Sequence, residues 1–218
     1  MKINSAIVTG STGMIAVALI KRLIQDEIYV HAIIRPNSKN LHRLPQSTFI
    51  NIIECDLSNI STITKQIHTS IDVFFHFAWE ASSQNRDTDI NSQIMNIKYS
   101  ADAYKVASIL KCHKFIGAGS QAEYGFNYDN ITVDESITPD PKTPYGITKL
   151  AAARLLFFMA KNSKTSVIWT RVFSIYGIND HEHTLINKLL VLNEGENFDT
   201  SSCEQHWDYL YEDDAGEA

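Results

Sequence analysis

A tyrosine and a lysine stand four residues apart in the segment YGITK, at Tyr145 and Lys149. If this segment opens a helix, both side chains fall on one helix face. A phenol with a pKa of ~10 transfers protons poorly at neutral pH unless a nearby cation favours the phenolate. Lys149 would supply that cation. On an arbitrary helix such a pair is usually solvated, so the spacing alone does not define a site.

A serine upstream strengthens this interpretation. Ser120 follows an apolar run that predicts a strand, KFIGAGS, and ligands bind beyond the carboxyl ends of strands in open α/β sheets. Its hydroxyl could hold the same substrate oxygen as Tyr145. The alternatives are a serine that only bonds nearby backbone, or a hydrolase nucleophile, although GAGSQ is not a GxSxG elbow. We predict Ser120, Tyr145 and Lys149 as the catalytic residues.

Glycines near the N-terminus predict a dinucleotide-binding loop. In TGSTGMIA, Gly10 and Gly13 follow an apolar strand and precede a helix, and Ala16 is small enough to replace a third glycine. Backbone amides at a helix N-terminus bind pyrophosphate, whereas an ordinary tight turn is the alternative if the motif stood alone. The predicted cofactor-binding residues of this loop are Gly10, Ser11, Thr12, Gly13, Met14 and Ile15.

The residue after the second predicted strand bears on the cofactor. Arg35 stands in IIRPNS, where dinucleotide folds place an acidic residue on a ribose hydroxyl or a basic residue near a phosphate. A surface arginine at a strand end is the plainer alternative. Arg35 favours NADP(H), with NAD(H) as the other choice.

Apolar periodicity supplies the elements that would position these residues. Short β-branched runs alternate with amphipathic stretches, which is typical of an α/β fold with a Rossmann-type, doubly wound parallel sheet. The predicted strands are Ile3–Thr9, Ile28–Ile34, Phe49–Ile53, Asp72–Phe77, Lys114–Ala118 and Ser166–Val172. The predicted helices are Gly13–Gln25, Thr62–His68, Ile90–Leu110, Tyr145–Lys161 and Leu185–Leu192.

The alternation fades near Gly177. We predict an NAD(P)-binding domain over residues 1–176 and a partial substrate-binding region over residues 177–218. The proline-rich segment Thr138–Gly146 is predicted to be a loop that leads into a helix.

Composition narrows the classes of partner. The 218 residues carry a net charge of −6, which argues against general nucleic-acid affinity. No apolar run has membrane-spanning length and the N-terminus lacks a signal-peptide pattern, so the expected location is the cytoplasm. Three cysteines, Cys55, Cys112 and Cys203, show no zinc spacing and are predicted to be free thiols, with no metal site.

Taken in order, several motifs resemble the extended short-chain dehydrogenase/reductase family, the NAD-dependent epimerase/dehydratase group that acts on nucleotide sugars. The resemblance covers essentially the whole chain. It rests on TGSTGMIA, CDL at residues 55–57, HFAW at 76–79, SQAEYG, YGITK and RVFSIYG at 171–177. Each motif is weak alone, but their shared order and spacing are specific.

The resemblance implies further cofactor contacts. Asp56 and Leu57 would flank the adenine, and Asn96 would support the site from a long helix. Phe77, Ala78 and Trp79 would line the ribose and nicotinamide side, while Phe173 and Ser174 would lie near the nicotinamide. Plain packing is the alternative for the aromatic residues. Relatives often pair through two long helices, which here implies a homodimer with a four-helix interface.

Departures from the pattern shape the expected reaction. Arg35 and the absence of an Asp–Glu pair after Ser120 favour NADPH-dependent reduction of a 4-keto-6-deoxy sugar nucleotide over dehydration. Tyr145 would protonate the C4 oxygen. The alternatives are an epimerase that retains NAD, or a non-catalytic dinucleotide-binding module. Trp207 stands where relatives place a diphosphate-binding arginine, and the chain is expected to be a fragment or to have an incomplete substrate lobe.

Overall fold

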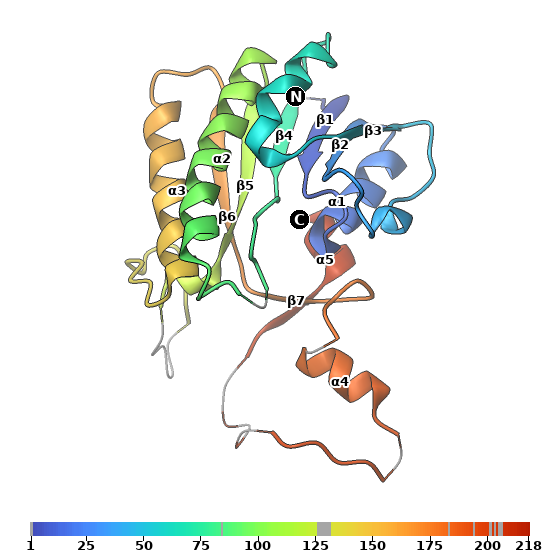
Figure 1. Cartoon of the computed structure of the whole chain (residues 1–218), viewed down its shortest axis with the longest axis vertical. Helices are drawn as coiled ribbons and strands as arrows, with labels where there is room; N and C mark the ends of the chain where they lie inside the picture. Colours follow the sequence, from blue (N-terminus) through green and yellow to red (C-terminus); the bar gives the residue numbers. More distant parts are fainter. Residues whose placement is uncertain are drawn as a thin grey trace.

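Six parallel strands form one sheet across the centre of the protein (Figure 1). The structure is a computed structural model that describes residues 2–83, 85–125, 132–182, 184–193, 195–200, 202, 204 and 207–218, so Cys203 lies outside the described residues. The strand order is β3-β2-β1-β4-β5-β6, which is the Rossmann order. The strands are β1 (Ser5–Thr9), β2 (Tyr29–Ile34), β3 (Ile50–Glu54), β4 (Val73–His76), β5 (Lys114–Ser120) and β6 (Ser166–Val172). The predicted doubly wound parallel sheet is confirmed.

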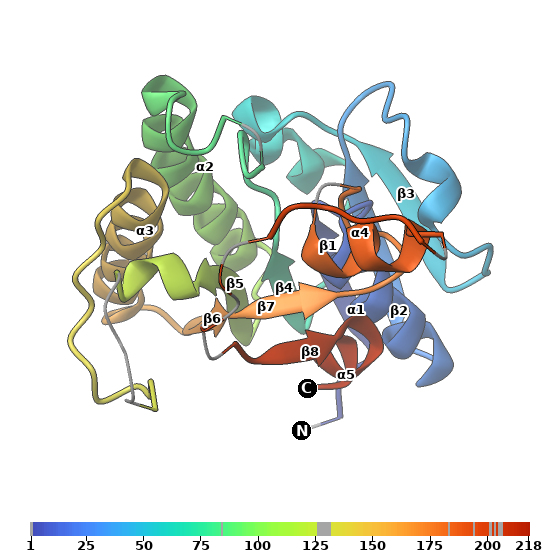
Figure 2. The same cartoon turned by 90° about the horizontal axis from the view of Figure 1, so that it is seen from below.

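Both faces of the central strands are buried, because their residues alternate between two apolar cores, whereas the edge strands β3 and β6 are partly exposed. In β1, Ile7 belongs to a core with Phe74 and Phe115, while Ala6 and Val8 belong to the opposite core. Helix α1 (Met14–Gln25) covers the second core. Helices α2 (Ile90–Ile109) and α3 (Pro144–Ala160) lie side by side over the first, which gives three layers (Figures 1 and 2).

Local capping sets where the long helices begin. Asp89 accepts a hydrogen bond from the Ser92 amide at the start of α2. Thr143 accepts one from the Gly146 amide at the start of α3, whose first residue is Pro144. Side-chain caps of this kind satisfy amides that have no partner within the helix. The cap at Thr143 therefore fixes the first turn of α3, which carries Tyr145.

Three short segments between strands and helices form 3₁₀ helices, where the sequence pattern predicts either an α-helix or no helix. The helix predicted at Thr62–His68 is instead a 3₁₀ segment, η2 (Leu57–Lys65), with a kink at Asn59. It begins earlier because the Asp56 carboxylate accepts the Ser58 amide. Two shorter 3₁₀ turns are η1 (Leu41–Arg43) and η3 (Gln121–Glu123).

The C-terminal segment contains elements that the sequence pattern did not predict. Strands β7 (Ser174–Tyr176) and β8 (Tyr209–Tyr211) pair in parallel, with α4 (Leu185–Val191) between them in the chain (Figure 2). Helix α5 (Glu212–Glu217) then packs against α1. A Cβ on Gly216 would lie 2.7 Å from the Ala18 carbonyl carbon, so the contact requires glycine. The boundary at residues 176 and 177 stays a prediction, although the last helix rests on the first segment.

Candidate active site

The glycine-rich loop lies at the carboxyl end of β1, next to β4, where the strand order changes direction. Gly10 has a φ of +67°, and a Cβ there would lie 2.7 Å from the Ala78 amide nitrogen. Both the conformation and the close approach demand glycine. Gly13 is the N-cap of α1 and offers no side-chain cap, so the first-turn amides are available for an anion. These features fit a dinucleotide pyrophosphate.

The other loop residues have distinct roles. The Ser11 hydroxyl is buried and donates to the Val8 carbonyl at 2.7 Å, which leaves the loop backbone rather than this side chain to contact a ligand. Arg43 donates to the carbonyl oxygens of Thr12 at 3.5 Å and Asn179 at 3.4 Å. It thereby joins the loop to the segment after β7. Met14 and Ile15 begin α1.

Charged residues gather at the ends of β2, β3 and β4. Arg35 is exposed, and its charge is felt by Asp56 and Glu80. Hydrogen bonds from Ser58 lower the pKa of Asp56, with a smaller contribution from Arg35. Burial raises the pKa of Glu80, and the Asp56 carboxylate raises it further. Leu57 is buried, and its contact with an adenine stays a prediction.

Asn96 holds the segment after β4, and its role in cofactor binding stays a prediction. Its Oδ1 accepts from the Glu80 amide and its Nδ2 donates to the Glu80 carbonyl, both at 2.9 Å. The Trp79 indole donates to Gln93 Oε1 at 2.9 Å, and Gln93 Nε2 donates to the Ala81 carbonyl. The Ala78 amide donates to the Thr9 hydroxyl at 3.3 Å. The loop is thus tied to both α2 and β1. Phe77 packs partly against the α1 core.

A buried histidine lies beneath this loop. The His76 ring nitrogens hydrogen-bond Thr9 Oγ1 at 2.9 Å and Ser100 Oγ at 3.3 Å. Burial lowers the pKa of His76 to about 3, with a smaller effect from Lys149. The imidazole is therefore neutral at physiological pH and acts as a structural link between β1, β4 and α2.

Of the three predicted catalytic residues, Ser120 and Tyr145 interact where β5 ends and α3 begins, and Lys149 lies one helical turn further along α3. The close approach depends on Gly146, since a Cβ there would overlap the Ala122 carbonyl oxygen just beyond Ser120. Burial raises the pKa of Tyr145, and a hydrogen bond with the Ser120 side chain opposes that rise. Arg86 lies over the Tyr145 ring, 5.4 Å from its centroid.

Lys149 differs from the expectation. Its Nζ donates to the Ala118 carbonyl at 2.6 Å and lies 3.8 Å from the Trp79 ring centroid, but 5.6 Å from the Tyr145 centroid. Burial lowers the pKa of Lys149 to about 7. The expected lowering of the phenol pKa by this cation is not seen, because burial of Tyr145 dominates and the lysine is engaged elsewhere.

The last predicted residues lie at the end of β6. Phe173 is 41% exposed, and its ring centroid is 6.1 Å from that of Tyr124. The Ser174 hydroxyl accepts a hydrogen bond from the Trp207 indole. Trp207 therefore turns toward β7 in the position where an arginine was expected. A half-exposed indole supplies stacking surface but no positive charge.

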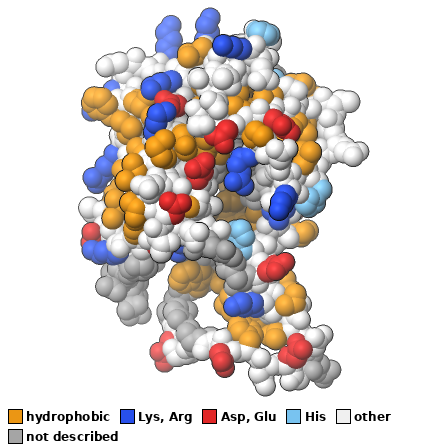
Figure 3. Space-filling view, in the orientation of Figure 1, with side chains coloured by type: hydrophobic (Ala, Val, Ile, Leu, Met, Phe, Trp, Pro, Cys, Tyr) orange, Lys and Arg blue, Asp and Glu red, His pale blue; other side chains and the backbone are white. Residues whose placement is uncertain are grey.

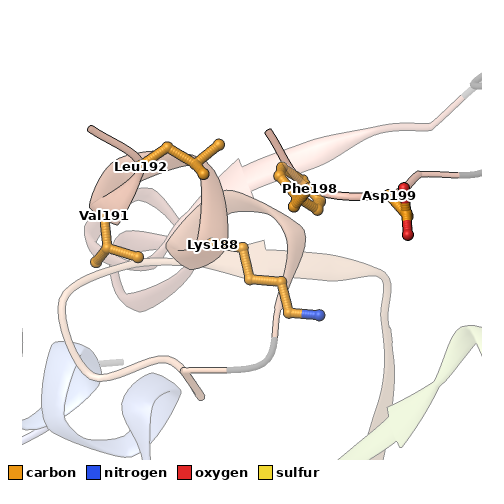
Figure 4. Close-up of a pocket in the computed structure, with 5 residues that line it drawn as sticks. All are labelled: Lys188, Val191, Leu192, Phe198 and Asp199. Atoms are coloured by element: carbon orange, nitrogen blue, oxygen red, sulfur yellow. The ribbon is translucent and has the colours of Figure 1, made fainter. Parts of the chain in front are cut away.

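A separate cavity of about 340 Å³ lies within the C-terminal segment (Figure 4). It is lined by Lys188, Val191, Leu192, Phe198 and Asp199, and by none of the three predicted catalytic residues. Across the described ranges, no group of three or more His, Cys, Asp or Glu side chains is arranged to hold a metal ion. No helix among those residues is long and apolar enough to cross a membrane.

Sequence reasoning missed several residues that build the site. Glu123, Arg171 and Gln93 are buried or partly buried and join elements far apart in the chain. One signal was present: Ser120 and Glu123 have the S-x-x-E spacing of a capping box, which the structure forms. Gln93, Glu80 and Arg43 depend on long-range contacts that have no local sequence signature.

The fold and the site together define a Rossmann-type dinucleotide-binding domain with a Ser, Tyr and Lys constellation at the carboxyl edge of its sheet. The sequence profile of the NAD dependent epimerase/dehydratase family matches residues 6–218. The chain belongs to that family, as the motif order indicated.

Particular relatives show the extent of the similarity. A trifunctional UDP-glucose 4,6-dehydratase/UDP-4-keto-6-deoxy-D-glucose 3,5-epimerase/UDP-4-keto-L-rhamnose-reductase of Arabidopsis thaliana is 25% identical over 204 residues, which cover 88% of this chain and 30% of that protein. The chain thus spans under a third of that relative's length.

Two solved structures share the fold. The UDP-N-acetylglucosamine 4-epimerase of Methanobrevibacter ruminantium M1, in complex with UDP-N-acetylmuramic acid, has a TM-score of 0.80 and 23% identity. The match covers 100% of this chain and 72% of that one. MoeE5, in complex with UDP-glucose and NAD, has a TM-score of 0.73 and 25% identity, covering 86% and 60%.

Proposed function

We propose that this protein is an NADPH-dependent reductase of a nucleotide-linked 4-keto-6-deoxy sugar. The observation that carries the proposal is the interaction of Ser120 with Tyr145, with Lys149 next to Trp79, the neighbour of the Ala78 amide that Gly10 of the glycine-rich loop approaches. A nicotinamide dinucleotide bound on that loop would supply the hydride. The relatives named above act on or bind UDP-sugars, which supports a nucleotide sugar as substrate.

The chain's own residues would manage the proton. Tyr145, protonated because burial raises the pKa of its phenol, donates to the oxygen that develops negative charge at C4. The Ser120 hydroxyl, which interacts with Tyr145, binds the same oxygen and fixes its direction. Lys149 would bind ribose hydroxyls after leaving the Ala118 carbonyl, and its ammonium would then stabilise the phenolate that Tyr145 becomes on giving up its proton.

The Tyr145→Phe variant tests the reaction. Oxidation of NADPH by a 4-keto-6-deoxy sugar nucleotide is followed by loss of absorbance at 340 nm. Loss of a general acid is expected to lower kcat by about 10²- to 10⁴-fold, with NADPH affinity within about threefold of wild type. Tyr104→Phe, which removes a buried hydroxyl that donates to the Thr165 carbonyl, is the matched control. Full activity of Tyr145→Phe refutes the assignment.

Preference for NADP(H) rests on Arg35. Its exposed guanidinium at the end of β2 could pair with a 2′-phosphate. Arg35→Asp is expected to weaken NADPH binding at least tenfold while leaving NADH affinity similar or improved. Exposed Arg154→Asp on α3 is the charge-matched control. Equal wild-type affinities for the two cofactors, both unaffected by Arg35→Asp, contradict the preference.

An epimerase that retains NAD is the second candidate function. Asp56 and Glu80 flank the Arg35 region, and carboxylates at this position can accept hydrogen bonds from a ribose. Mass spectrometry of ligand retained by the purified protein separates the two. Copurifying NAD and interconversion of sugar epimers without net NADPH use identify the epimerase. Binding of NADP(H) without turnover identifies a non-catalytic module.

We also propose a homodimer formed through α2 and α3. Apolar side chains gather over these helices (Figure 3), including exposed Ile94 and Ile109 on α2 and Ile147, Phe157 and Phe158 on α3. Large exposed apolar side chains gathered on one side of a protein mark an interaction face. Light scattering is expected to give twice the chain mass, and Phe158→Glu is expected to give the monomer mass. A monomeric wild type contradicts the proposal; Leu190→Glu on exposed α4 is the control.

A further inference from the structure

A buried ion pair lies directly behind Ser120. The carboxylate of Glu123, fully buried, accepts three hydrogen bonds: from the Ser120 amide at 2.9 Å, the Trp169 indole at 2.8 Å and Arg171 Nε at 3.0 Å. Arg171 also donates to the Tyr124 hydroxyl at 2.9 Å. One carboxylate therefore joins η3 to two positions on β6.

This arrangement fixes the backbone on both sides of Ser120. The Ser120 hydroxyl accepts from the Ala122 amide at 3.2 Å, while its own amide is held by Glu123, which completes a capping box. The preceding residue is also confined, because a Cβ on Gly119 would overlap both Trp169 and Glu123. Ser120 has little room to shift along the strand or to rotate away from α3.

The energetic character of the pair suggests why it is present. A buried ion pair is costly to desolvate, and apolar side chains of similar volume often stabilise a fold as well or better. Its benefit is directional, since a carboxylate accepts several hydrogen bonds in a defined geometry. The charge of Glu123 also reaches the catalytic groups, where it raises the pKa of Tyr145 and opposes the effect of burial on Lys149.

We propose that Glu123, held by Arg171 and Trp169, is a positioning residue that keeps the Ser120 hydroxyl directed toward Tyr145. The effect on turnover rests on the proposed function, whereas the effect on Ser120 itself does not. Glu123 touches neither substrate nor cofactor in this role; it acts through the Ser120 backbone.

Two substitutions at Glu123 distinguish the effect of side-chain length from the effect of the negative charge. Glu123→Gln removes the charge but keeps an oxygen that can accept from Ser120 and Trp169. The side-chain NH2 of the glutamine would face the Nε donor of Arg171. We therefore expect Glu123→Gln to lower the stability of the protein rather than its activity. Glu123→Asp keeps the charge but shortens the side chain by one methylene, so it cannot reach Ser120 and Arg171 together. Tyr104→Phe again serves as control, because it removes a buried hydrogen bond to the Thr165 carbonyl away from Ser120.

Two measurements on cofactor-loaded protein test the proposal. Residue-resolved hydrogen exchange at the Ser120 amide is expected to be at least tenfold faster in Glu123→Asp than in wild type, and near wild type in Glu123→Gln and Tyr104→Phe. For ketosugar reduction, Glu123→Asp is expected to lower kcat by about 10- to 100-fold, with KM and NADPH affinity within threefold. Glu123→Gln is expected to retain most of kcat.

The two measurements distinguish failure of the proposed function from failure of the positioning role of Glu123. If wild-type protein reduces no sugar, the proposed function fails, and exchange at Ser120 still decides the positioning. Unchanged exchange in Glu123→Asp overturns the inference. So does a kcat loss in Glu123→Gln that exceeds the loss in Glu123→Asp, since that pattern assigns the effect to charge.

Discussion

Replacing Lys149 by methionine is expected to stabilise the cofactor-free protein at neutral pH, although it removes a residue that we propose to be catalytic. The side chain is 4% exposed, and burial lowers its pKa from the ordinary value of 10.5 to about 7. At ~1.4 kcal/mol per pKa unit, the ammonium form is disfavoured in the folded protein by up to about 5 kcal/mol. Methionine matches the length of the lysine stem without carrying the charge.

The sign of the pH dependence follows from the two pKa values. Below pH 7, both folded and unfolded chains hold the proton and the full cost applies. Between pH 7 and 10.5 the unfolded chain binds more protons than the folded chain, so wild-type stability from this group rises with pH. The rise from pH 7 to pH 9 is about 2 kcal/mol. Lys149→Met lacks this contribution.

The net gain is smaller than the gross cost. Loss of the hydrogen bond to the Ala118 carbonyl and of the contact with Trp79 offsets about 2 kcal/mol. Lys149→Met is therefore expected to be about 2 kcal/mol more stable than wild type at pH 7 and about equal to it at pH 9. Urea unfolding at both pH values, analysed by linear extrapolation, measures the difference.

Exposed Lys164→Met is the matched control and is expected to change stability equally at the two pH values. Two results refute the reasoning. One is a Lys149→Met protein that is less stable than wild type at pH 7. The other is a stability difference that does not shrink from pH 7 to pH 9, since a buried amine must give that slope.

Two other substitutions test the packing around the site. Glu212→Val is expected to raise the free energy of unfolding by about 1–3 kcal/mol in thermal unfolding, because the Glu212 side chain is buried and its Oε2 has no hydrogen-bond partner among the described residues. The control, Glu217→Ala, breaks an exposed ion pair and should change stability little. A Glu212→Val protein that is less stable than wild type would show that the Glu212 carboxylate has a partner in the folded protein. Gly146→Ala is expected to lower the free energy of unfolding by about 1–3 kcal/mol and to lower kcat, since the added methyl overlaps the Ala122 carbonyl. Wild-type kinetics in this variant would show that the arrangement of Tyr145 and Ser120 does not depend on the close contact between Gly146 and Ala122.

The sheet could be predicted from sequence because its strands carry short apolar runs separated by turn residues and helical stretches. Strands such as SAIVT and VFFH are buried on both faces, so their composition predicts parallel pairing without any long-range knowledge. Strands β7 and β8 have only three residues each and are partly exposed, so they are too short to show an apolar periodicity in the sequence. Helix α5 was hidden for a related reason: its sequence EDDAGE is acidic, yet Glu212 and Gly216 are buried.

Within the site, sequence predicted residue types better than their partners. Gly10 has the positive φ that a tight turn needs, and Asn96 holds the Glu80 backbone, while their roles toward a cofactor stay predictions. The orientation of Lys149 was not accessible, because it depends on Trp79 and on a carbonyl 31 residues away in sequence. The same holds for Glu123, whose donors on β6 are 46 and 48 residues distant.

The pairing of β7 with β8 has a consequence for how substrate choice could diversify. The chain leaves the first segment after Tyr176 and returns at Tyr209, and the parallel register places Ser174 opposite Tyr209 and Tyr176 opposite Tyr211. The residues between β7 and β8 thus form a long connection whose two ends are held together by the pairing of these strands. Closing a longer connection costs only a logarithmic increment of entropy. Under the proposed function, insertions or exchanges between these strands would alter the sugar that is bound, while the dinucleotide-binding domain, against which α5 packs through α1, would stay unchanged.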